Sequence, residues 1–352
     1  MSVTQPSTPV TERVLVAMSG GVDSSVAAAL LLEQGHDVTG VTLKLWGGES
    51  DSGCCSVADV EDARRVAAQL DIPHYVFNLT DAFDDAVVEP YVRDHEAGRT
   101  PNPCVECNRA LKFGALLRRA DALGFDAIAT GHHARVTTEP DGARALRRGA
   151  DAAKDQSYVL YMLGQRELAR TRLPVGELTK AEVRDHAARL GLRTATKAES
   201  MDVCFITRGG RRSFLAERIP ARAGAVVDTH GMTIGAHDGV EAFTVGQRRG
   251  LGVATGARRY VVDVDARTAT VTLGARADLL RESVTLRDVT HVGASPVRRG
   301  GLTAQTRAHG TPVPASFDGS TVCFATPQPR VAPGQVVALY AEDALVGGGI
   351  AT

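Results

Sequence analysis

Three cysteines stand in sequence contexts that suit sulfur or metal chemistry. Cys104 and Cys107 are two residues apart in AGRTPNPCVECNRALKF, where two prolines stiffen a loop just before a predicted helix. Cys107 lies near the N-terminus of that helix, whose dipole favours thiolate over thiol, and Arg109 and Lys112 add positive charge. The third cysteine, Cys204, follows much later in ESMDVCFITRG. These residues are the first candidates for a reactive site.

Two kinds of chemistry fit this set. Cys104 and Cys107 could form half of a zinc or iron–sulfur site, with Cys54 and Cys55 as the other half. Adjacent cysteines have poor geometry for ligating one metal ion, which weighs against this interpretation. The alternative is a sulfur relay, in which one cysteine carries a persulfide and another completes the thiol–disulfide exchange. The residues alone leave both interpretations open.

The stretch VLVAMSGGVDSSVAAALLLEQG, residues 14–35, has the features of a phosphate loop. Gly20 and Gly21 let the backbone approach an anion, and the amides that open the following helix add the positive end of its dipole. The lysine of a nucleoside-triphosphatase P-loop is missing, so the loop suits the pyrophosphate that leaves when ATP donates AMP. Asp23 could help to hold Mg²⁺ on these phosphates. The hydroxyl donors here are Ser19, Ser24 and Ser25.

The elements that must position these residues alternate between strand and helix in the first half of the chain. Serine and threonine caps open two of the helices, at Ser56 and Thr179, and Gly35 suits a left-handed helix end. This alternation predicts an α/β domain with a doubly wound parallel sheet. Predicted strands cover 14–18, 38–45, 74–79 and 125–130, and predicted helices cover 24–34, 57–70 and 179–191.

The second half of the chain has a different texture. From about Gly224, short β-like segments separated by Gly, Pro and Asp replace the helical periodicity. We expect a small β-rich central module and a C-terminal β-barrel after the α/β domain. The expected boundaries are a disordered tail at 1–12, the α/β domain with the candidate catalytic residues at 13–208, the central β-rich module at 209–280 and the barrel at 281–352.

Composition places the chain among globular proteins. Of its 352 residues, 43% are hydrophobic and 23% charged, no apolar run reaches the length of a membrane span, and the polar start lacks a secretory h-region. We therefore expect a cytoplasmic protein, in which six cysteines suit catalysis or metal binding better than structural disulfides. The net charge of −1 neither requires nor excludes a nucleic-acid partner, so binding would depend on local clusters of basic residues. Those clusters are Arg208, Arg211, Arg212, Arg248, Arg249, Arg258, Arg259, Arg298 and Arg299.

Seven motifs carry a family resemblance: SGGVDSS, GRTPNP followed by Cys107, ATGHH, KDQSY, PVGELTK, CFI and TVGQRRGLG. The first resembles the PP-loop of the N-type ATP pyrophosphatases. Together, in this order and across nearly the whole chain, they resemble the MnmA-type tRNA-uridine 2-thiolases. The resemblance implies a PP-loop enzyme that uses ATP and Mg²⁺ to place sulfur on C2 of the wobble uridine, releasing AMP and pyrophosphate. It also implies a cysteine desulfurase or sulfur-relay protein as partner, and tRNAs for Lys, Glu and Gln.

The resemblance also implies residue roles. Cys204 would carry the persulfide and Cys107 would be the nucleophile, which leaves a transient Cys107–Cys204 disulfide. The segment around the target base would be Asn102, Pro103 and Cys104. Residues at ATP would be Ala17, Met18, Ser19, Gly20, Gly21, Val22, Asp23, Ser24, Leu43 and Gly131, with Asp23 also the candidate for magnesium. Residues at tRNA would be His132, Lys154, Asp155, Gln156, Arg307, Ala308 and Gln335.

One position departs from the family pattern. Many members carry aspartate, proposed as a general base, where this chain has Cys104. A neutral thiol replaces a carboxylate poorly, so either the anionic persulfide needs no base or another acid such as Glu106 serves. The rivals to this function are another adenylating ligase or amidotransferase and a metal-binding RNA-binding protein. Elsewhere we expect Trp46 to pack, His133 to support the site and Cys323 to fill a small core position.

Overall fold

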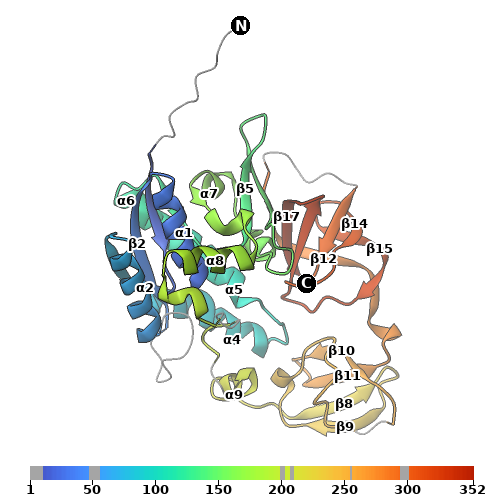
Figure 1. The fold of residues 1–352 in the computed structure, drawn as a ribbon. Coiled ribbons are helices and arrows are strands. Elements are labelled where there is room, and N and C mark those ends of the chain that lie inside the picture. Colours follow the sequence, from blue (N-terminus) through green and yellow to red (C-terminus); the bar gives the residue numbers. More distant parts are fainter. Residues whose placement is uncertain (1–10, 47–55, 199–202, 207–209, 254–255, 294–300) are drawn as a thin grey trace.

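The computed structural model describes residues 11–46, 56–198, 203–206, 210–253, 256–293 and 301–352 (Figure 1). Several sequence-based expectations fall on other residues. Most of the predicted tail at 1–12, the pair Cys54 and Cys55, and the arginines Arg208, Arg298 and Arg299 lie outside the described residues. Within the described residues, no helix is both long and apolar enough to cross a bilayer.

A five-stranded parallel sheet forms the centre of the N-terminal half, with strand order β3-β2-β1-β4-β7. Most of the apolar residues of β1, β2 and β4 are buried between helices, as expected for a parallel sheet, whereas the edge strand β3 exposes Tyr75 and Val76. The four strands predicted in this region are all present, and the prediction of a doubly wound parallel sheet is confirmed. The strands are β1 (Arg13–Ala17), β2 (Asp37–Lys44), β3 (His74–Asn78), β4 (Ala127–Ala129) and β7 (Thr171–Arg172).

The helices around this sheet begin where the capping residues predict. Ser56 and Thr179 each form a reciprocal capping box with the acidic residue three positions later. Gly35 ends the first helix with φ +84°, as predicted. The helices are α1 (Val22–Glu33), α2 (Val57–Gln69), α3 (Thr80–Phe83), α4 (Glu89–Glu96), α6 (Leu116–Ala122), α7 (Gln165–Ala169) and α8 (Lys180–Arg189). Shorter turns are η1 (Asp84–Val88), η3 (Ser157–Leu160), η4 (Pro174–Glu177) and η5 (Arg193–Thr196).

The cysteine pair lies inside a helix, and the prediction of a loop before the helix is wrong. Helix α5 (Pro103–Cys107) continues through the π-helical turn η2 (Asn108–Ala115) into α6. Proline fits the first helical position because it needs no amide hydrogen there. The side chain of Asn102 accepts a hydrogen bond from the Cys104 amide at 3.1 Å and so caps the helix. Both cysteines therefore occupy the N-terminal turns of one long helical segment.

The central module has a small sheet with its own core. Strands β8 (Gly224–Asp228), β9 (Thr233–His237), β10 (Tyr260–Asp265) and β11 (Thr270–Gly274) lie in the order β10-β11-β8-β9, with turns η6 (Val240–Ala242) and η7 (Ala277–Leu279). Val226, Val261 and Leu273 are buried in its centre. The helix before it, α9 (Gly210–Ala216), packs Phe214 and Leu215 into the main core of the molecule instead.

The C-terminal barrel closes on itself and also joins the first domain. Strand β12 pairs with both β15 and β17, which closes the six strands. A hairpin from the first half, β5 (Ala134–Thr138) and β6 (Arg144–Arg148), extends this sheet beside β17, with Leu146 opposite Leu345. The sequence did not predict this hairpin. The barrel strands are β12 (Leu280–His291), β13 (Leu302–Gln305), β14 (Val313–Phe317), β15 (Thr321–Pro329), β16 (Val336–Ala341) and β17 (Ala344–Ala351).

Two minor predictions have opposite outcomes. Cys323 is exposed, so its assignment to the core is wrong. It lies on β15 between the buried residues Val322 and Phe324, and alternate side chains of a strand face opposite sides. Trp46 packs as predicted, with its ring centroid 6.2 Å from that of Phe205.

Candidate functional site

The phosphate loop joins β1 to α1 at the carboxyl edge of the parallel sheet (Figure 1). Gly20 has φ +71°, and a side chain there would overlap the backbone carbonyl of Asp59 in α2. Gly21 is extended at φ −92° and ψ 165°, and among the described residues a Cβ at this position would meet only the Ser19 hydroxyl, at 3.5 Å. Glycine is therefore needed at the two positions for different reasons. At Gly20 it allows close packing against α2, and at Gly21 it leaves the backbone open to an approaching anion.

Two of the three serines of the loop are buried and hydrogen-bonded to its backbone, and the third is exposed. The hydroxyls of Ser24 and Ser25 donate to the carbonyl of Gly21, at 3.1 and 2.8 Å, and both residues are buried. Ser19 is exposed at the mouth of the loop, and its amide donates to the Ser24 hydroxyl at 3.2 Å. Ser24 and Ser25 thus hold the turn in shape, while Ser19 faces outward beside the helix terminus.

A lysine from a distant helix reaches the loop. The ammonium of Lys180, the first residue of α8, lies 2.7 Å from each carboxylate oxygen of Asp23. The ring of His133 lies 3.1 Å from the same carboxylate, and Lys180 is fixed from behind because its amide donates to Asp151 at 3.0 Å. Burial alone would raise the pKa of Asp23, but the hydrogen bonds from His133 and Lys180 outweigh it and lower that pKa.

The sequence interpretation missed Lys180, although it belongs to the motif PVGELTK. Nothing along the chain places residue 180 beside residue 23. The pairing exists because α8 packs against α1, and both helices contribute to one buried cluster through Val26 and Val183. The loop that lacks a lysine of its own therefore has one supplied by tertiary structure.

Three other residues predicted at ATP, namely Met18, Leu43 and Gly131, lie at or near the carboxyl ends of the parallel strands. Gly131 follows β4, and a side chain there would lie 2.6 Å from the Ser24 nitrogen, so only glycine fits. The side chains of Met18 and Leu43 are buried, and the Met18 carbonyl accepts a hydrogen bond from the Thr42 hydroxyl at 2.8 Å. Any contact of Met18 or Leu43 with a nucleotide would therefore be made by main-chain atoms.

The structure packs both cysteine segments against the same hydrophobic core. Cys107 is buried in the main core, and Cys204 is partly buried and packs against the same core. The ring of Tyr91 lies 5.3 Å from that of Phe205, the neighbour of Cys204. Burial raises the pKa of Tyr91 to about 12, Arg211 acts in the opposite direction, and Cys104 contributes to the increase. Tyr91 thus contacts the neighbour of Cys204 and lies within electrostatic range of Cys104.

The turn that carries Cys204 has strained backbone. Val203, directly before it, has φ +56°, which a β-branched residue rarely adopts. The Ile206 amide donates to the Val203 carbonyl at 3.1 Å and closes a tight turn around the cysteine. Strain of this kind persists where the surroundings enforce it, and it concentrates at functional sites.

Glu106 is the acid nearest to the cysteine pair along the helix. Burial raises its pKa, while the guanidinium of Arg109, 3.4 Å away, acts in the opposite direction. Arg109 also donates to the Tyr161 hydroxyl at 3.1 Å. A carboxyl group with a raised pKa on the helix that carries the cysteines is a candidate for proton transfer.

Several residues predicted to contact tRNA have structural partners. His132 is buried beside the Thr130 hydroxyl at 2.7 Å, and burial, followed by Lys112, lowers its pKa well below the ordinary value. The carboxylate of Asp155 accepts hydrogen bonds from Arg148 at 2.7 Å and from the Ser157 hydroxyl at 3.0 Å. These contacts hold the segment in place, and its contact with tRNA stays a prediction.

The remaining predicted tRNA residues follow a similar pattern. Gln156 accepts a hydrogen bond from the His133 amide at 2.9 Å. In the barrel, the side chain of Gln305 donates to the carbonyls of Arg307 and Ala308, at 3.0 and 2.8 Å, while the Arg307 side chain is exposed. Gln335 donates to the carbonyl of Thr100 at 2.6 Å, which links the barrel to the cysteine helix.

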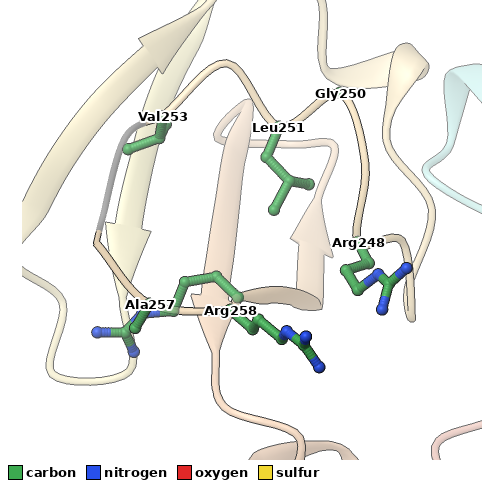
Figure 2. A pocket seen from close by; sticks show the side chains of 7 residues that line it. Arg248, Gly250, Leu251, Val253, Ala257 and Arg258 are labelled. Atoms are coloured by element: carbon green, nitrogen blue, oxygen red, sulfur yellow. The ribbon is translucent and has the colours of Figure 1, made fainter.

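A basic cavity of about 410 Å³ lies in the central module. Figure 2 shows Arg248, Leu251 and Arg258 among the residues that line it. Arg259 also lines the cavity, and its Nε is buried without a hydrogen-bond partner. Among the described residues, no carboxylate forms a salt bridge with these three arginines. Their charge is therefore available to an anion.

The metal-site interpretation gains no support from the part of the chain that the structure describes. Within those ranges, no group of three or more His, Cys, Asp or Glu side chains could hold a metal ion. Cys54 and Cys55, the suggested second half of such a site, lie outside them.

Three family models match consecutive parts of the chain. Residues 12–208 match a tRNA methyl transferase HUP domain, residues 212–275 a tRNA methyl transferase PRC-barrel domain, and residues 281–351 an aminomethyltransferase beta-barrel domain. These matches follow the parallel-sheet domain, the small central sheet and the closed barrel described above.

Curated relatives match over nearly the full length. A protein of Herpetosiphon aurantiacus is 47% identical over 348 residues, which cover 96% of this chain and 97% of that protein. One of Streptomyces avermitilis is 48% identical over 357 residues, covering 97% and 95%. Both are called tRNA-specific 2-thiouridylase MnmA. A solved 4-thiouridine synthetase–RNA complex with bound ATP is far more remote: 19% identity, 55% of this chain, 44% of that chain and a TM-score of 0.37.

Proposed function

This chain belongs to the tRNA-specific 2-thiouridylase family, and we propose that it replaces the C2 oxygen of the wobble uridine of tRNA with sulfur in an ATP-dependent reaction. What supports this proposal is a phosphate loop in a chain whose Cys107 and Cys204 both pack against one extensive core. A reaction that activates an oxygen and then delivers sulfur needs both parts.

The cysteines also favour sulfur transfer over the methyl transfer in the family description of residues 12–208. Methyl transfer to RNA needs neither a phosphate loop for ATP nor two separated cysteines. The relatives that match at 47–48% identity carry the thiouridylase name instead. We therefore take the methyl transferase description as a label for the fold.

Adenylation is the first step of the proposed reaction. The C2 oxygen of uracil belongs to a urea-like carbonyl and is a poor leaving group. Attack of this oxygen on the α-phosphate of ATP forms an O-adenylyl uridine and releases pyrophosphate. The amides at the start of α1 and the ammonium of Lys180 would stabilise the phosphate charge.

A magnesium ion at the phosphate loop would have to share Asp23 with Lys180. Asp23, the residue predicted for magnesium, already accepts two hydrogen bonds from the Lys180 ammonium. A divalent ion at Asp23 would compete with this ammonium group for the same oxygens. We propose that Lys180 supplies the first positive charge near the phosphates and that Asp23 orients it.

Sulfur transfer completes the reaction. The terminal sulfur of a Cys204 persulfide attacks C2, and AMP leaves with the former oxygen. The Cys107 thiolate then attacks the Cys204 sulfur, which breaks the sulfur–sulfur bond to the base. The base keeps the terminal sulfur as 2-thiouridine, and the two cysteines become a disulfide that an external thiol reduces. A cysteine desulfurase or sulfur-relay protein would reload Cys204.

Glu106 is the proposed proton acceptor in this chain. Cys104 occupies the position where many relatives carry aspartate, and a neutral thiol accepts protons poorly. Glu106 lies on the same helix with a pKa raised by burial. It could take the proton of Cys107 before that thiol attacks.

The arginines of the central cavity are proposed to bind phosphates of the tRNA backbone. None of the three forms a salt bridge with a described carboxylate, although Arg259 helps to lower the pKa of Asp228, and phosphate contacts set affinity for nucleic acids. Combining Arg258→Ala with Arg259→Ala should weaken tRNA binding and flatten its salt dependence, by roughly 0.9 log units of slope per lost phosphate contact. An unchanged slope in filter-binding titrations would remove this cavity from the RNA interface.

Reconstitution tests the function as a whole. The protein is incubated with ATP, unmodified tRNA for Lys, Glu or Gln, a cysteine desulfurase and cysteine, and the products are analysed by mass spectrometry. We expect 2-thiouridine and an equal amount of AMP. Activity of Cys107→Ser with ammonia as acceptor would favour an amidotransferase, and stoichiometric zinc or iron after anaerobic purification would favour a metal-binding RNA-binding protein.

A further inference from the structure

The segment that leads into the cysteine helix is held by the C-terminal barrel. The amide of Thr100 donates to the Pro333 carbonyl at 2.7 Å, and the side chain of Gln335 donates to the Thr100 carbonyl at 2.6 Å. A side chain at Gly334 would lie 3.1 Å from the backbone of Thr100. We call this contact between Thr100 and residues 333–335 the Thr100 clamp.

The barrel side of the clamp is firmly built. The amide of Gly334 donates to the Ala351 carbonyl at 2.9 Å, and the Ala351 amide donates to the Gln335 carbonyl at 2.8 Å. Gly334 has φ +91°, which only glycine adopts without strain. The turn is thus tied to the end of β17, and Thr100 is fixed to the barrel rather than to a loose loop.

The central module contacts the same segment from another direction. A side chain at Gly98, where φ is +74°, would lie 3.1 Å from the Ala266 side chain in the turn between β10 and β11. Asp94 and Arg99 close the segment with a salt bridge at 2.5 Å. Residues 98–100 therefore lie in contact with both β-rich parts of the molecule.

Thr100 is two residues before the helix cap. Pro101 and Pro103 flank the capping residue Asn102, and each proline fixes one backbone angle. Few backbone bonds between Thr100 and this helix can rotate freely. A shift of Thr100 therefore moves the start of the helix that carries Cys104 and Cys107. The hydrogen bonds to Thr100 therefore fix the segment that enters this helix.

We propose that Gln335 is a positioning residue, through which the C-terminal barrel sets the orientation of the cysteine helix. The proposal rests on the proposed function for its effect on rate, but the clamp itself is independent of it. It assigns Gln335 a role in the catalytic step in addition to, or in place of, a contact with tRNA. The barrel then affects sulfur transfer as well as substrate affinity.

The test compares Gln335→Glu with Gln328→Glu. Gln335→Glu keeps the size of the side chain but puts a carboxylate against the Thr100 carbonyl in place of a donor. Gln328 is a glutamine of the same barrel whose side chain, within the described residues, bonds to Thr326 alone, at 3.0 and 3.1 Å, so its variant controls for the added charge. Each variant is assayed for single-turnover thiolation at saturating tRNA, for tRNA affinity, and for hydrogen exchange of residues 100–108 without tRNA.

We expect Gln335→Glu to reduce the saturated rate about three- to tenfold, as the loss of one hydrogen bond predicts. Exchange at residues 100–108 should increase, and the dissociation constant for tRNA should change no more than for Gln328→Glu. Unchanged exchange together with weaker tRNA binding and a normal saturated rate would overturn the proposal. If the wild-type protein forms no 2-thiouridine, the proposed function fails, while the exchange measurement still decides the clamp.

Discussion

Lys180 and Asp23 form the ion pair on which the phosphate loop depends. Their side chains lie 13% and 31% exposed, so the pair is partly shielded from water and less screened than a surface salt bridge. The carboxylate holds the ammonium at the helix terminus, where phosphate oxygens would arrive. The lysine that a phosphate loop commonly carries in its own sequence comes here from α8.

Lys180→Met should therefore slow adenylation. Removing one preorganised positive group from a phosphate site costs about 10²–10³-fold in rate. The measurement is release of AMP and pyrophosphate with tRNA present, and Lys180→Arg should recover part of the activity because it keeps the charge. Arg189→Met, which removes an exposed salt bridge between the same helix and Glu33, is the matched control. Wild-type rates in Lys180→Met would exclude this role.

At the scale of elements, features that depend on neighbouring residues could be predicted from the sequence, whereas contacts between segments far apart in the chain could not. The capping boxes at Ser56 and Thr179 were predicted because their partners lie three residues away. The docking of the β5–β6 hairpin beside β17 was missed because the two segments lie far apart in the sequence. The helix start at Pro103 was missed because proline indicates both a stiff loop and a first helical turn.

The same division applies to the candidate site. The glycines and serines of the phosphate loop were found because they are contiguous, and Cys107 and Cys204 were assigned through a family resemblance. Lys180 has no neighbour along the chain that connects it to Asp23, so only the packing of α8 on α1 reveals it. Gln335 was assigned to tRNA, and its hydrogen bond to Thr100 required the structure.

The two glycines of the phosphate loop give a matched prediction about these elements. Gly20→Ala should destabilise the protein by several kcal/mol, about 1–3 from the positive φ plus the overlap with Asp59. Gly21→Ala should change stability by less than about 1 kcal/mol, because its φ is negative and its surroundings are open. Urea denaturation gives both values. Equal losses at the two positions would contradict the assignment of Gly20 to helix packing.

Gly21→Ala should nevertheless impair the reaction. A methyl group at the mouth of the loop would obstruct close approach of phosphate to the backbone. We expect weaker ATP binding in a folded protein, measured by calorimetric titration. Normal ATP affinity in Gly21→Ala would place the phosphates elsewhere.

At the scale of the whole molecule, one large core joins the catalytic domain, α9 and part of the barrel. Two histidines are buried without charge next to this core. Burial, followed by Arg211, lowers the pKa of His95 to about 3, and burial lowers that of His132 well below its ordinary value. The folded protein therefore binds fewer protons than the unfolded chain between the two pKa values of His95.

This difference predicts acid sensitivity. In the unfolded chain this histidine has a pKa of 6.5. Above pH 6.5 it is neutral in both states and costs no stability, whereas below pH 6.5 only the unfolded chain binds the proton, so stability is lost as the pH falls. The free energy of unfolding should decrease as the pH is lowered, by up to ~1.4 kcal/mol per pH unit for His95. Glu106, whose pKa is raised, acts in the opposite direction over part of this range.

The contribution of His95 can be isolated by substitution. His95→Phe keeps the aromatic contact with Tyr91, whose ring is 4.6 Å away, and removes the titrating group. Its stability should depend less steeply on pH between about 6.5 and 5 in urea denaturation, whereas His230→Phe at an exposed position should match the wild type. Equal slopes for His95→Phe and the wild type would show that another group causes the acid sensitivity.

The central claim is that ATP makes the C2 oxygen of uridine replaceable and that Cys107 and Cys204 together deliver the sulfur. The most direct measurement is one turnover with persulfide-loaded protein, ATP and unmodified tRNA, without an external thiol, followed by non-reducing peptide mass spectrometry. We predict a Cys107–Cys204 disulfide in an amount equal to the 2-thiouridine formed. Formation of 2-thiouridine with both cysteines still reduced, or at the wild-type level in Cys107→Ser, would contradict the account.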